Sequence, residues 1–442
     1  MTEYLNVDSA RTRQHRRPFL SQRLLERALG TFIHNGTLQL RLPDGSTRRF
    51  GQGSPEIAIA IRDWRTLRRI ALNADLAVGE AWIDGTLTVE RGDIYGFLDL
   101  CLSNAGTGPG YTLRRLQQKL RRLVRPLLMY NPIGKAQKNV AHHYDLSDEL
   151  YDLFLDNERQ YSCALFASPT DTLEQAQARK MAHIANKLCL EPGQKLLDIG
   201  SGWGGLGLFM ARKSGVDVTG VTLSVEQQKY AQARAVREGL AKQARFELRD
   251  YRQESDRYDR IVSVGMFEHV GAGHYVEYFA KVAALLKENG VAMIHTIGSV
   301  TGPSAPHPWI RKYIFPGGYI PSLSEIMPAI EKSGLVVTDI EVLRLHYAKT
   351  LKAWRTRFMA GRDEMVARYD ERFCRMWEFY LAACEAGFRH NGLVVFQIQL
   401  SHRFDAVPLT RDYLTSADGS DAGNRAAFDR PTGRPRSRQA AE

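Results

Sequence analysis

The fold is decided by the stretch Leu196-Leu197-Asp198-Ile199-Gly200-Ser201-Gly202-Trp203-Gly204-Gly205. A short apolar run that carries one acid ends in a glycine-rich turn, and a helical stretch follows. The glycines allow tight backbone geometry and let a ligand approach the main chain closely. No Gly-Lys-Ser/Thr follows the glycines, so a P-loop is excluded. The turn indicates either a ligand site at the end of a strand or a purely structural turn.

Short β-rich runs recur along this part of the chain, at 195–199, 216–222, 245–248, 260–264 and 291–296. Amphipathic helical stretches separate them, which favours one α/β domain with a largely parallel sheet. The acid inside the first strand, with GxGxG after it, resembles the first motif of S-adenosylmethionine-dependent methyltransferases. This resemblance implies a class I methyltransferase fold with a Rossmann-like, seven-stranded sheet. A nucleotide-binding turn is the alternative.

The ends of the next strands supply further candidate cofactor contacts. Most methyltransferases place a carboxylate after the second strand, but Thr222-Leu223-Ser224 contains no acid. Glu226 and Gln227 lie just beyond, at the start of a helix for which Ser224 is a suitable N-cap. Asp250-Tyr251 follows the third strand, where an acid and an aromatic ring would suit adenine. Val264 ends the fourth strand, beside the expected position of the transferred methyl.

Length and composition bound the class of protein. At roughly 150 residues per domain, 442 residues correspond to about three domains. The chain is 44% hydrophobic and 25% charged, which excludes wholesale disorder, collagen and coiled coil. No apolar run approaches the roughly 18 residues of a membrane span, and no secretory signal is visible at the N-terminus. We therefore expect a globular protein that does not cross a membrane.

The cysteine content and the net charge indicate which cellular compartment and which kind of partner to expect. The five cysteines are odd in number and lack a CxxC spacing, which argues against a disulfide scaffold or a structural zinc site. His142 and His143 also lack metal-ligand spacing, so no metal is expected. A reducing cytoplasm fits best. The net charge of +11 favours a polyanionic partner, either nucleic acid or an anionic membrane surface, with a solvated basic surface as the alternative.

The N-terminal region predicts a small α+β domain. Residues 1–19 are polar and are expected to be mobile. Within 20–110, the pattern predicts a helix at 20–29 and a strand at 37–42. Pro-Asp-Gly-Ser at 43–46 then supplies the turn of a hairpin.

A basic amphipathic helix is predicted over 111–140, after a glycine-rich linker. Eight Lys or Arg residues and no acid lie between 111 and 139. Apolar residues fall among them at helical spacing: Leu113, Leu116, Leu120, Leu123, Val124, Leu127 and Leu128. Such helices lie on anionic bilayers. The alternative is packing against another domain or a second copy, as in a homodimer. The catalytic domain is expected at 141–410, followed by a disordered tail at 411–442.

Further motifs extend the pattern over about 140–400. They are His143-Tyr144-Asp145-Leu146-Ser147, Phe154-Leu155-Asp156, Tyr161-Ser162-Cys163-Ala164, Gly220-Val221-Thr222-Leu223-Ser224-Val225-Glu226-Gln227, Phe267-Glu268-His269-Val270-Gly271, His295-Thr296-Ile297-Gly298, Tyr313-Ile314-Phe315-Pro316-Gly317-Gly318, Tyr347, Thr350-Leu351, Ala353-Trp354 and Cys384. With these motifs in order, the chain resembles the cyclopropane-fatty-acyl-phospholipid synthases, a family that includes the mycolic acid cyclopropane synthases. Gly79-Glu80-Ala81-Trp82-Ile83-Asp84-Gly85 resembles the N-terminal domain of the longer, phospholipid-acting members.

The resemblance implies methylene transfer from S-adenosylmethionine to the cis double bond of a phospholipid acyl chain. A methyl- or methylene-branched product is the alternative within the same enzyme class. In this family the Thr-Leu-Ser-x-x-Gln segment replaces the missing acid after the second strand. Together with the strand-end residues, the expected cofactor contacts are Tyr161, Ser162, Asp198, Gly200, Gly202, Thr222, Leu223, Gln227, Asp250, Tyr251 and Val264.

The resemblance also implies a bound bicarbonate as the catalytic base. Glu268 and His295 would hold it by their side chains, Tyr347 by its hydroxyl, and Cys163 and Ile297 largely through backbone groups. An acid beside an anion needs a shared proton, so we expect a raised pKa at Glu268. Cys163 need not act as a nucleophile, because no covalent intermediate is required.

The sequence leaves the roles of three further features open. Cys384 is sometimes assigned to the active site in this family, and core packing is its alternative role. His269 follows Glu268 directly and is interpreted as fixing its orientation. The aromatic segment 315–321, with Trp309 and Tyr313, is interpreted as part of a cap over an acyl channel, or else as a surface loop with an apolar anchor.

The expected partner is the acyl chain of a phospholipid at an anionic membrane surface, with residues 20–110 docking on the lipid. The protein would then be cytoplasmic and peripheral to the inner face of the membrane. A nucleic-acid methyltransferase is the competing interpretation of the basic charge. Enzymes that methylate base amines commonly carry Asn/Asp-Pro-Pro-Tyr/Phe after the fourth strand, and this chain has Gly265-Met266-Phe267-Glu268 there. No nucleic-acid partner is therefore expected.

Overall fold

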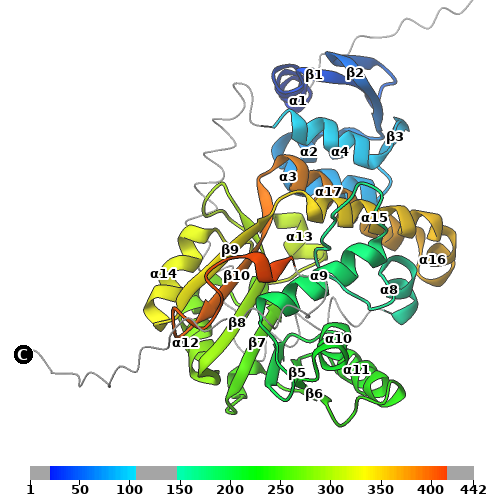
Figure 1. The fold of residues 1–442 in the computed structure, drawn as a ribbon. Helices are drawn as coiled ribbons and strands as arrows, with labels where there is room; N and C mark the ends of the chain where they lie inside the picture. Colours follow the sequence, from blue (N-terminus) through cyan, green and yellow to red (C-terminus); the bar gives the residue numbers. More distant parts are fainter. Residues whose placement is uncertain (1–19, 106–146, 416–442) are drawn as a thin grey trace, which may run out of the picture.

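The computed structural model describes residues 20–105 and 147–415 (Figure 1). The first range holds α1 (Leu20–Phe32), β1 (Asn35–Arg41), β2 (Thr47–Ile61), α2 (Trp64–Leu72), α3 (Ala74–Ile83), β3 (Leu87–Arg91) and α4 (Ile94–Ser103). The three strands form an antiparallel sheet in the order β1-β2-β3. The predicted helix, strand and hairpin are present, and in the turn Asp44 Oδ1 accepts a 2.9 Å hydrogen bond from the Ser46 N–H.

The second range is built on a seven-stranded sheet. Its strands are β4 (Lys195–Ile199), β5 (Asp217–Thr222), β6 (Ala244–Leu248), β7 (Tyr258–Val264), β8 (Leu286–Ser299), β9 (Val336–Leu343) and β10 (Leu393–Ser401). The order is β6-β5-β4-β7-β8-β10-β9, and β10 runs antiparallel to both of its neighbours. The strands from β6 to β8 pair in parallel, which confirms the predicted α/β fold with a largely parallel sheet.

Helices cover both faces of this sheet, because neighbouring residues of each buried strand point to opposite sides. Leu196 packs in a core cluster with α9 (Leu173–Lys187), α10 (Gly205–Ser214) and α11 (Val225–Arg237). Leu197 packs in another with α12 (Tyr275–Leu285) and α14 (Leu323–Ser333). Continuous apolar runs such as 195–199 are therefore buried on both faces.

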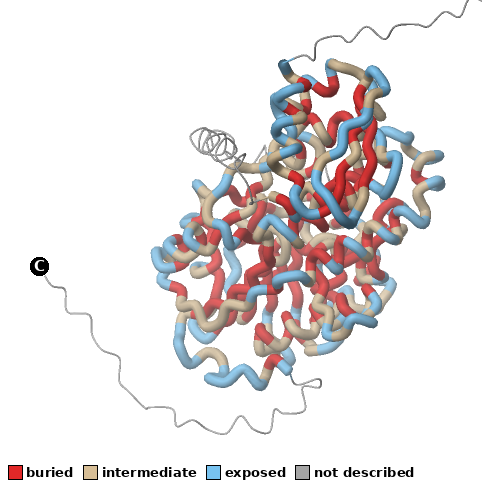
Figure 2. Tube along the Cα trace, turned by 90° about the horizontal axis from the view of Figure 1, so that it is seen from above, coloured by how far each residue is buried: buried red, intermediate tan, exposed pale blue. Residues whose placement is uncertain are grey.

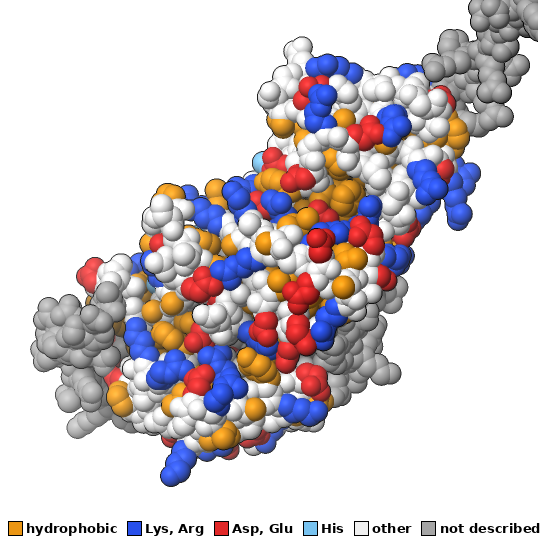
Figure 3. All heavy atoms as spheres, turned by 90° about the vertical axis from the view of Figure 1, so that its right-hand side faces the viewer, with side chains coloured by type: hydrophobic (Ala, Val, Ile, Leu, Met, Phe, Trp, Pro, Cys, Tyr) orange, Lys and Arg blue, Asp and Glu red, His pale blue; other side chains and the backbone are white. Residues whose placement is uncertain are grey.

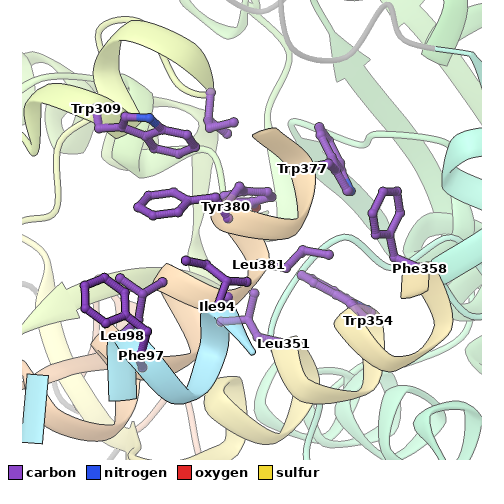
Figure 4. Packing of buried hydrophobic residues seen from close by; sticks show 14 of the residues in the cluster. Ile94, Phe97, Leu98, Trp309, Leu351, Trp354, Phe358, Trp377, Tyr380 and Leu381 are labelled. Carbon is purple, nitrogen blue, oxygen red and sulfur yellow. The ribbon is translucent and has the colours of Figure 1, made fainter. Parts of the chain in front are cut away.

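A third group of helices lies between the N-terminal part and the large sheet (Figure 1). It comprises α8 (Asp148–Phe154), α13 (Pro308–Tyr313), α15 (His346–Ala360), α16 (Arg362–Arg368) and α17 (Glu371–His390). Figure 4 shows Ile94, Phe97 and Leu98 of α4 beside Leu351 of α15 and Leu381 of α17. These side chains belong to one apolar cluster that continues from the N-terminal part into the second range, and Figure 2 shows buried stretches in both parts.

The helix α3 crosses this group at close range. A Cβ atom on Gly79 would come within 2.8 Å of the Phe379 ring and would also clash with Trp309. The rings of Trp309 and Phe379 lie 4.7 Å apart between their centroids. Trp309 is fully buried here and anchors helix α13 in the core between the two parts.

The chain continues in regular form slightly past residue 411. Asp412–Leu414 form a short 3-10 helix in which Leu414 is buried, and the Tyr413 hydroxyl donates a 3.3 Å hydrogen bond to Gln399 Oε1. The predicted mobile segment 1–19, the whole of the predicted helix at 111–140 and the rest of the tail lie outside the described residues. Among the described helices, none is both long enough and apolar enough to cross a membrane.

Candidate active site

A pocket opens at the carboxyl ends of β4, β5 and β7, where open α/β sheets usually bind ligands. The glycine-rich turn after β4 forms one wall. Gly202 has a φ of +54°, a left-handed conformation that residues with a Cβ rarely adopt. A Cβ atom at this position would meet nothing within 4 Å, so the main chain here faces open space. A ligand can therefore approach the turn directly.

All eleven residues that the sequence proposes for cofactor binding line this one pocket: Tyr161, Ser162, Asp198, Gly200, Gly202, Thr222, Leu223, Gln227, Asp250, Tyr251 and Val264. The sequence did not single out several other lining residues: Arg159, Gln160, Arg249, Arg252 and His274. Most of these are direct neighbours of predicted residues, and that adjacency was the signal available to find them.

A hydrogen-bonded pair takes the place of the absent acid after β5. Thr222 Oγ1 donates a 2.9 Å hydrogen bond to Gln227 Oε1 and accepts one of 3.2 Å from the Ser224 N–H. Ser224 caps α11 as predicted, because its Oγ accepts from the Gln227 N–H at 3.2 Å. The cap fixes the first turn of α11 and so holds Gln227 against the strand end.

The two acidic side chains that line the pocket, Asp198 and Asp250, have different surroundings. Asp198 is buried and its Oδ2 has no hydrogen-bond partner within the described residues. Burial raises the pKa of Asp198 to about 7, and the Lys180 ammonium opposes that rise. Asp250 is held by Arg252 through contacts of 2.9 and 2.6 Å. A ligand amine at Asp250 would therefore share that carboxylate with Arg252.

Glu268 lies in a short 3-10 helix, Phe267–His269, at the end of β7. Its Oε1 accepts a 2.7 Å hydrogen bond from the Ile297 N–H of β8. Its Oε2 is buried and has no hydrogen-bond partner within the described residues. Burial raises the pKa of Glu268 to about 7, the direction predicted, so the carboxyl can hold a proton near neutral pH.

Tyr347, at the start of α15, shares this neighbourhood. Burial raises the pKa of Tyr347 well above 10, and acidic side chains around it raise that pKa further: Tyr380, Cys163, Glu268 and Cys384. The Tyr380 hydroxyl lies 2.7 Å from that of Tyr161, which lines the pocket. Predicted catalytic groups from α15, α17 and the segment before α9 therefore lie near the pocket, although none of them lines it.

The two cysteines of this neighbourhood are neutral thiols. Burial raises the pKa of both, to about 12 for Cys384 and well above its ordinary value for Cys163. The Cys163 Sγ lies 3.4 Å from the Ala164 carbonyl, to which it donates. A buried thiol of this kind is a poor nucleophile, in line with the role expected for Cys163.

His295 approaches from the α9 side of the sheet. Its Nδ1 lies 3.2 Å from Gln397 Nε2 on β10, and its carbonyl accepts a 2.9 Å hydrogen bond from Gly265 in the pocket wall. Burial holds the pKa of His295 well below 6.5, so the ring is neutral. Within the described ranges, no hydrogen bond joins His295 to Glu268 or Tyr347.

Two predicted contacts differ in detail from the sequence-based interpretation. The Ile297 N–H, expected to face an anion, already donates to Glu268. His269, expected to orient Glu268, lines the pocket itself and has its ring 5.8 Å from that of Phe315. Burial lowers the pKa of His269 to about 4. Across residues 20–105 and 147–415, no cluster of three His, Cys, Asp or Glu side chains could hold a metal.

Comparison with known proteins gives a consistent picture. The sequence model of the family described as mycolic acid cyclopropane synthetase matches residues 133–398. The chain is 39% identical to the cyclopropane-fatty-acyl-phospholipid synthase of Escherichia coli K12 over 359 residues, covering 79% of this chain and 89% of that one. It is 37% identical to a probable fatty acid methyltransferase of Pseudomonas putida over 371 residues, covering 82% and 91%.

A solved structure supports the same fold. Mycolic acid cyclopropane synthase CmaA1, complexed with SAH and CTAB, matches with a TM-score of 0.57 and 34% identity over 61% of this chain and 99% of that one. The fold is therefore that of the class I methyltransferases, as the sequence predicted.

Proposed function

The chain belongs to the mycolic acid cyclopropane synthetase family, and from this premise we propose that it makes cyclopropane fatty acids. The reaction would transfer a methylene group from S-adenosylmethionine to the cis double bond of an unsaturated phospholipid acyl chain. The relative from Escherichia coli, whose name states this activity, aligns with most of the chain. The observation that carries the proposal is Glu268, whose buried Oε2 beside the pocket has no hydrogen-bond partner within the described residues.

The pocket fits S-adenosylmethionine, which supplies an electrophilic methyl group when bound. Gly202 leaves its main chain open to a ligand, and the buried Asp198 Oδ2 has no partner within the described residues. Tyr251 and Asp250 line the same pocket and supply an aromatic ring and an acid. The Thr222–Gln227 pair stands where related folds place a ribose-binding acid. These groups would bind and orient the cofactor.

The chemistry explains the buried neighbourhood of Glu268. A cis alkene is a weak nucleophile, so the site must hold it in line with the methyl group and exclude water from the resulting carbocation. A proton must then leave the new methyl so that the ring can close. The base in this proposal is a bound bicarbonate. The protonated Glu268 carboxyl can donate a hydrogen bond to that anion, which stays a base, and the neutral Tyr347 hydroxyl and the neutral His295 ring can hold it.

A second product is favoured by one comparison. The relative from Pseudomonas putida is named a probable fatty acid methyltransferase and is nearly as similar. The same carbocation could lose a different proton, or be reduced by a partner enzyme, to give a methylene- or methyl-branched chain. The two products need the same pocket and the same neighbourhood of Glu268.

Membrane contact is proposed for the segment 111–140, with the protein peripheral to the cytoplasmic face. Of the 60 Lys and Arg residues, 43 lie in the described ranges, as do 42 of the 49 Asp and Glu residues. Basic and acidic side chains are interspersed on the face in Figure 3. The excess positive charge therefore comes almost entirely from the other segments, above all 106–146. Attraction of that stretch to anionic lipid would bring the pocket to the acyl chains.

The experiment is an assay of the purified protein with S-adenosylmethionine, bicarbonate and liposomes of unsaturated phospholipid. Fatty acid methyl esters are then analysed by gas chromatography, mass spectrometry and NMR. A gain of CH₂ with cyclopropane ring protons is expected. A methyl or methylene branch would move the function to the second candidate. No lipid product, with the cofactor still bound, would reject both.

A further inference from the structure

Helix α9 lies beneath the segment 160–163, which forms part of the pocket wall. Two side chains of α9, three positions apart and so on one face of the helix, hold this segment. Gln177 Nε2 donates to the backbone carbonyls of Gln160 and Ser162 at 3.2 and 3.0 Å. Lys180 Nζ donates to the side chains of the same two residues, at 2.6 Å to Gln160 Oε1 and 2.8 Å to Ser162 Oγ.

Lys180 is fully buried, and its ammonium is surrounded by groups of the site. The ionisable groups that act on it are Asp156, Cys163 and Asp198, and it acts in turn on His295. Two of its hydrogen-bond partners and one of its acids line the pocket. A buried cation is costly to maintain, so a lysine here needs a reason beyond filling space.

We propose that Lys180 is a positioning residue of the cofactor pocket. Its ammonium fixes the side chains of Gln160 and Ser162 and places a positive charge behind the carboxylate of Asp198. Tyr161 lies between the two held residues, so its ring and its contact with the Tyr380 hydroxyl are set by the same anchor. This inference rests on the proposed function, because it assigns Lys180 to the pocket that would bind S-adenosylmethionine.

The same helix provides a matched control. Lys187 lies seven residues further along α9 and is also fully buried. Its Nζ pairs with Asp339 at 3.2 Å and Glu341 at 2.7 Å, two residues of β9 that do not line the pocket. Replacing either lysine by methionine removes a buried charge from one helix at similar depth. A general effect on folding would therefore appear in both variants, whereas an effect on the pocket would appear in one.

The test measures S-adenosylmethionine binding by calorimetry for the wild-type protein, Lys180→Met and Lys187→Met, with thermal unfolding alongside. We expect Lys180→Met to weaken binding at least tenfold and Lys187→Met to leave it within twofold, whichever variant is less stable. In a Ser162→Ala background, Lys180→Met should weaken cofactor binding by a clearly smaller factor, because one shared hydrogen bond is already gone. Under turnover, KM for the cofactor should rise more than kcat falls.

Each other result has a defined meaning. Equal binding by wild type and Lys180→Met would overturn the inference while leaving the proposed function intact. Equal weakening by both lysine variants would also overturn it, because the effect would then be one of folding. Absence of binding by the wild type would instead reject the proposed function itself. Should Lys180→Met fail to fold, Gln177→Leu and Ser162→Ala test the same anchor, and unchanged binding in both would overturn it.

Discussion

The backbone N–H of Ile297 donates a 2.7 Å hydrogen bond to Glu268 Oε1. This bond ties the 3-10 helix after β7 to the middle of the sheet and fixes the direction of the carboxyl group. The other oxygen, Oε2, is left buried and unpaired within the described residues. One oxygen of Glu268 therefore fixes the position of the carboxyl group, and the other can bind a ligand or carry a proton.

Glu268→Gln should abolish turnover while leaving the cofactor pocket intact. The amide oxygen can still accept from Ile297, but the side chain can no longer carry a proton near neutral pH. We expect kcat to fall by at least about 100-fold, with the S-adenosylmethionine Kd within twofold of wild type. Single-turnover product analysis and calorimetry measure the two quantities. Near-normal turnover would show that the Glu268 proton takes no part.

Gly202→Val should remove cofactor binding. The valine side chain would enter the space that the pocket offers to a ligand, and the left-handed backbone would add roughly 1–2 kcal/mol of strain. Gly193→Val is the control: Gly193 also has a positive φ, +78°, with nothing within 4 Å, but it lies outside the pocket. Equilibrium dialysis with labelled cofactor should find binding lost in the first variant and kept in the second. Cofactor binding by both variants would show that the cofactor site does not lie at Gly202.

His269 should make the protein sensitive to acid. Burial holds the pKa of His269 at about 4, below its value of about 6.5 in an unfolded chain. The unfolded state therefore binds the extra proton first, and stability is lost as pH falls from about 6.5 towards 4. His269→Asn stays neutral, so its free energy of unfolding should lose roughly 2 kcal/mol less over this window. Urea titrations at pH 7.5 and pH 4.5 measure the difference, and equal losses would contradict the assignment.

The segment 111–140 should carry the attraction to lipid. Leu120→Glu combined with Leu127→Glu places two charges on its apolar face and should reduce binding to anionic liposomes at least tenfold, with cofactor affinity unchanged. Gln117→Glu combined with Gln118→Glu adds the same charge at polar positions and should have a much smaller effect. Co-sedimentation at matched salt gives the comparison, with RNA as a competing ligand. Tighter binding to RNA than to liposomes would favour the nucleic-acid interpretation.

Local patterns were enough to predict much of the sheet. The run 195–199 was predicted with the bounds of β4, because it is apolar on both faces and ends at glycine. β8 is longer than its predicted 291–296, since it begins at Leu286 and passes through Lys287, Glu288 and Asn289. Those polar residues read as a loop in the sequence, whereas their backbone is extended in the structure.

The site residues that lie in local sequence motifs could be predicted. Those that reach the site only through contacts between distant segments could not. Tyr161 and Ser162 were found through a motif. Lys180 stands in a polar helical run, Gln-Ala-Arg-Lys, where a lysine normally faces solvent. It is buried because a segment twenty residues earlier folds over α9, and no local pattern reports that contact. Trp309 was missed as a core anchor for the same reason, since its partner Gly79 lies 230 positions away.

Because α3 packs closely against Trp309 and Phe379, we expect the N-terminal part to stay associated with the rest of the protein without a covalent link, as a separate subunit would. Its contact surface is apolar, and Glu80 forms an ion pair across it with Lys312 at 2.6 Å, while also pairing with Arg69 of the N-terminal part. The family's sequence model starts at residue 133, so this contact joins residues outside that model to residues within it. A chain cut by protease between 106 and 146 should therefore elute from a sizing column as one particle at native size, and its two fragments should separate only in denaturant.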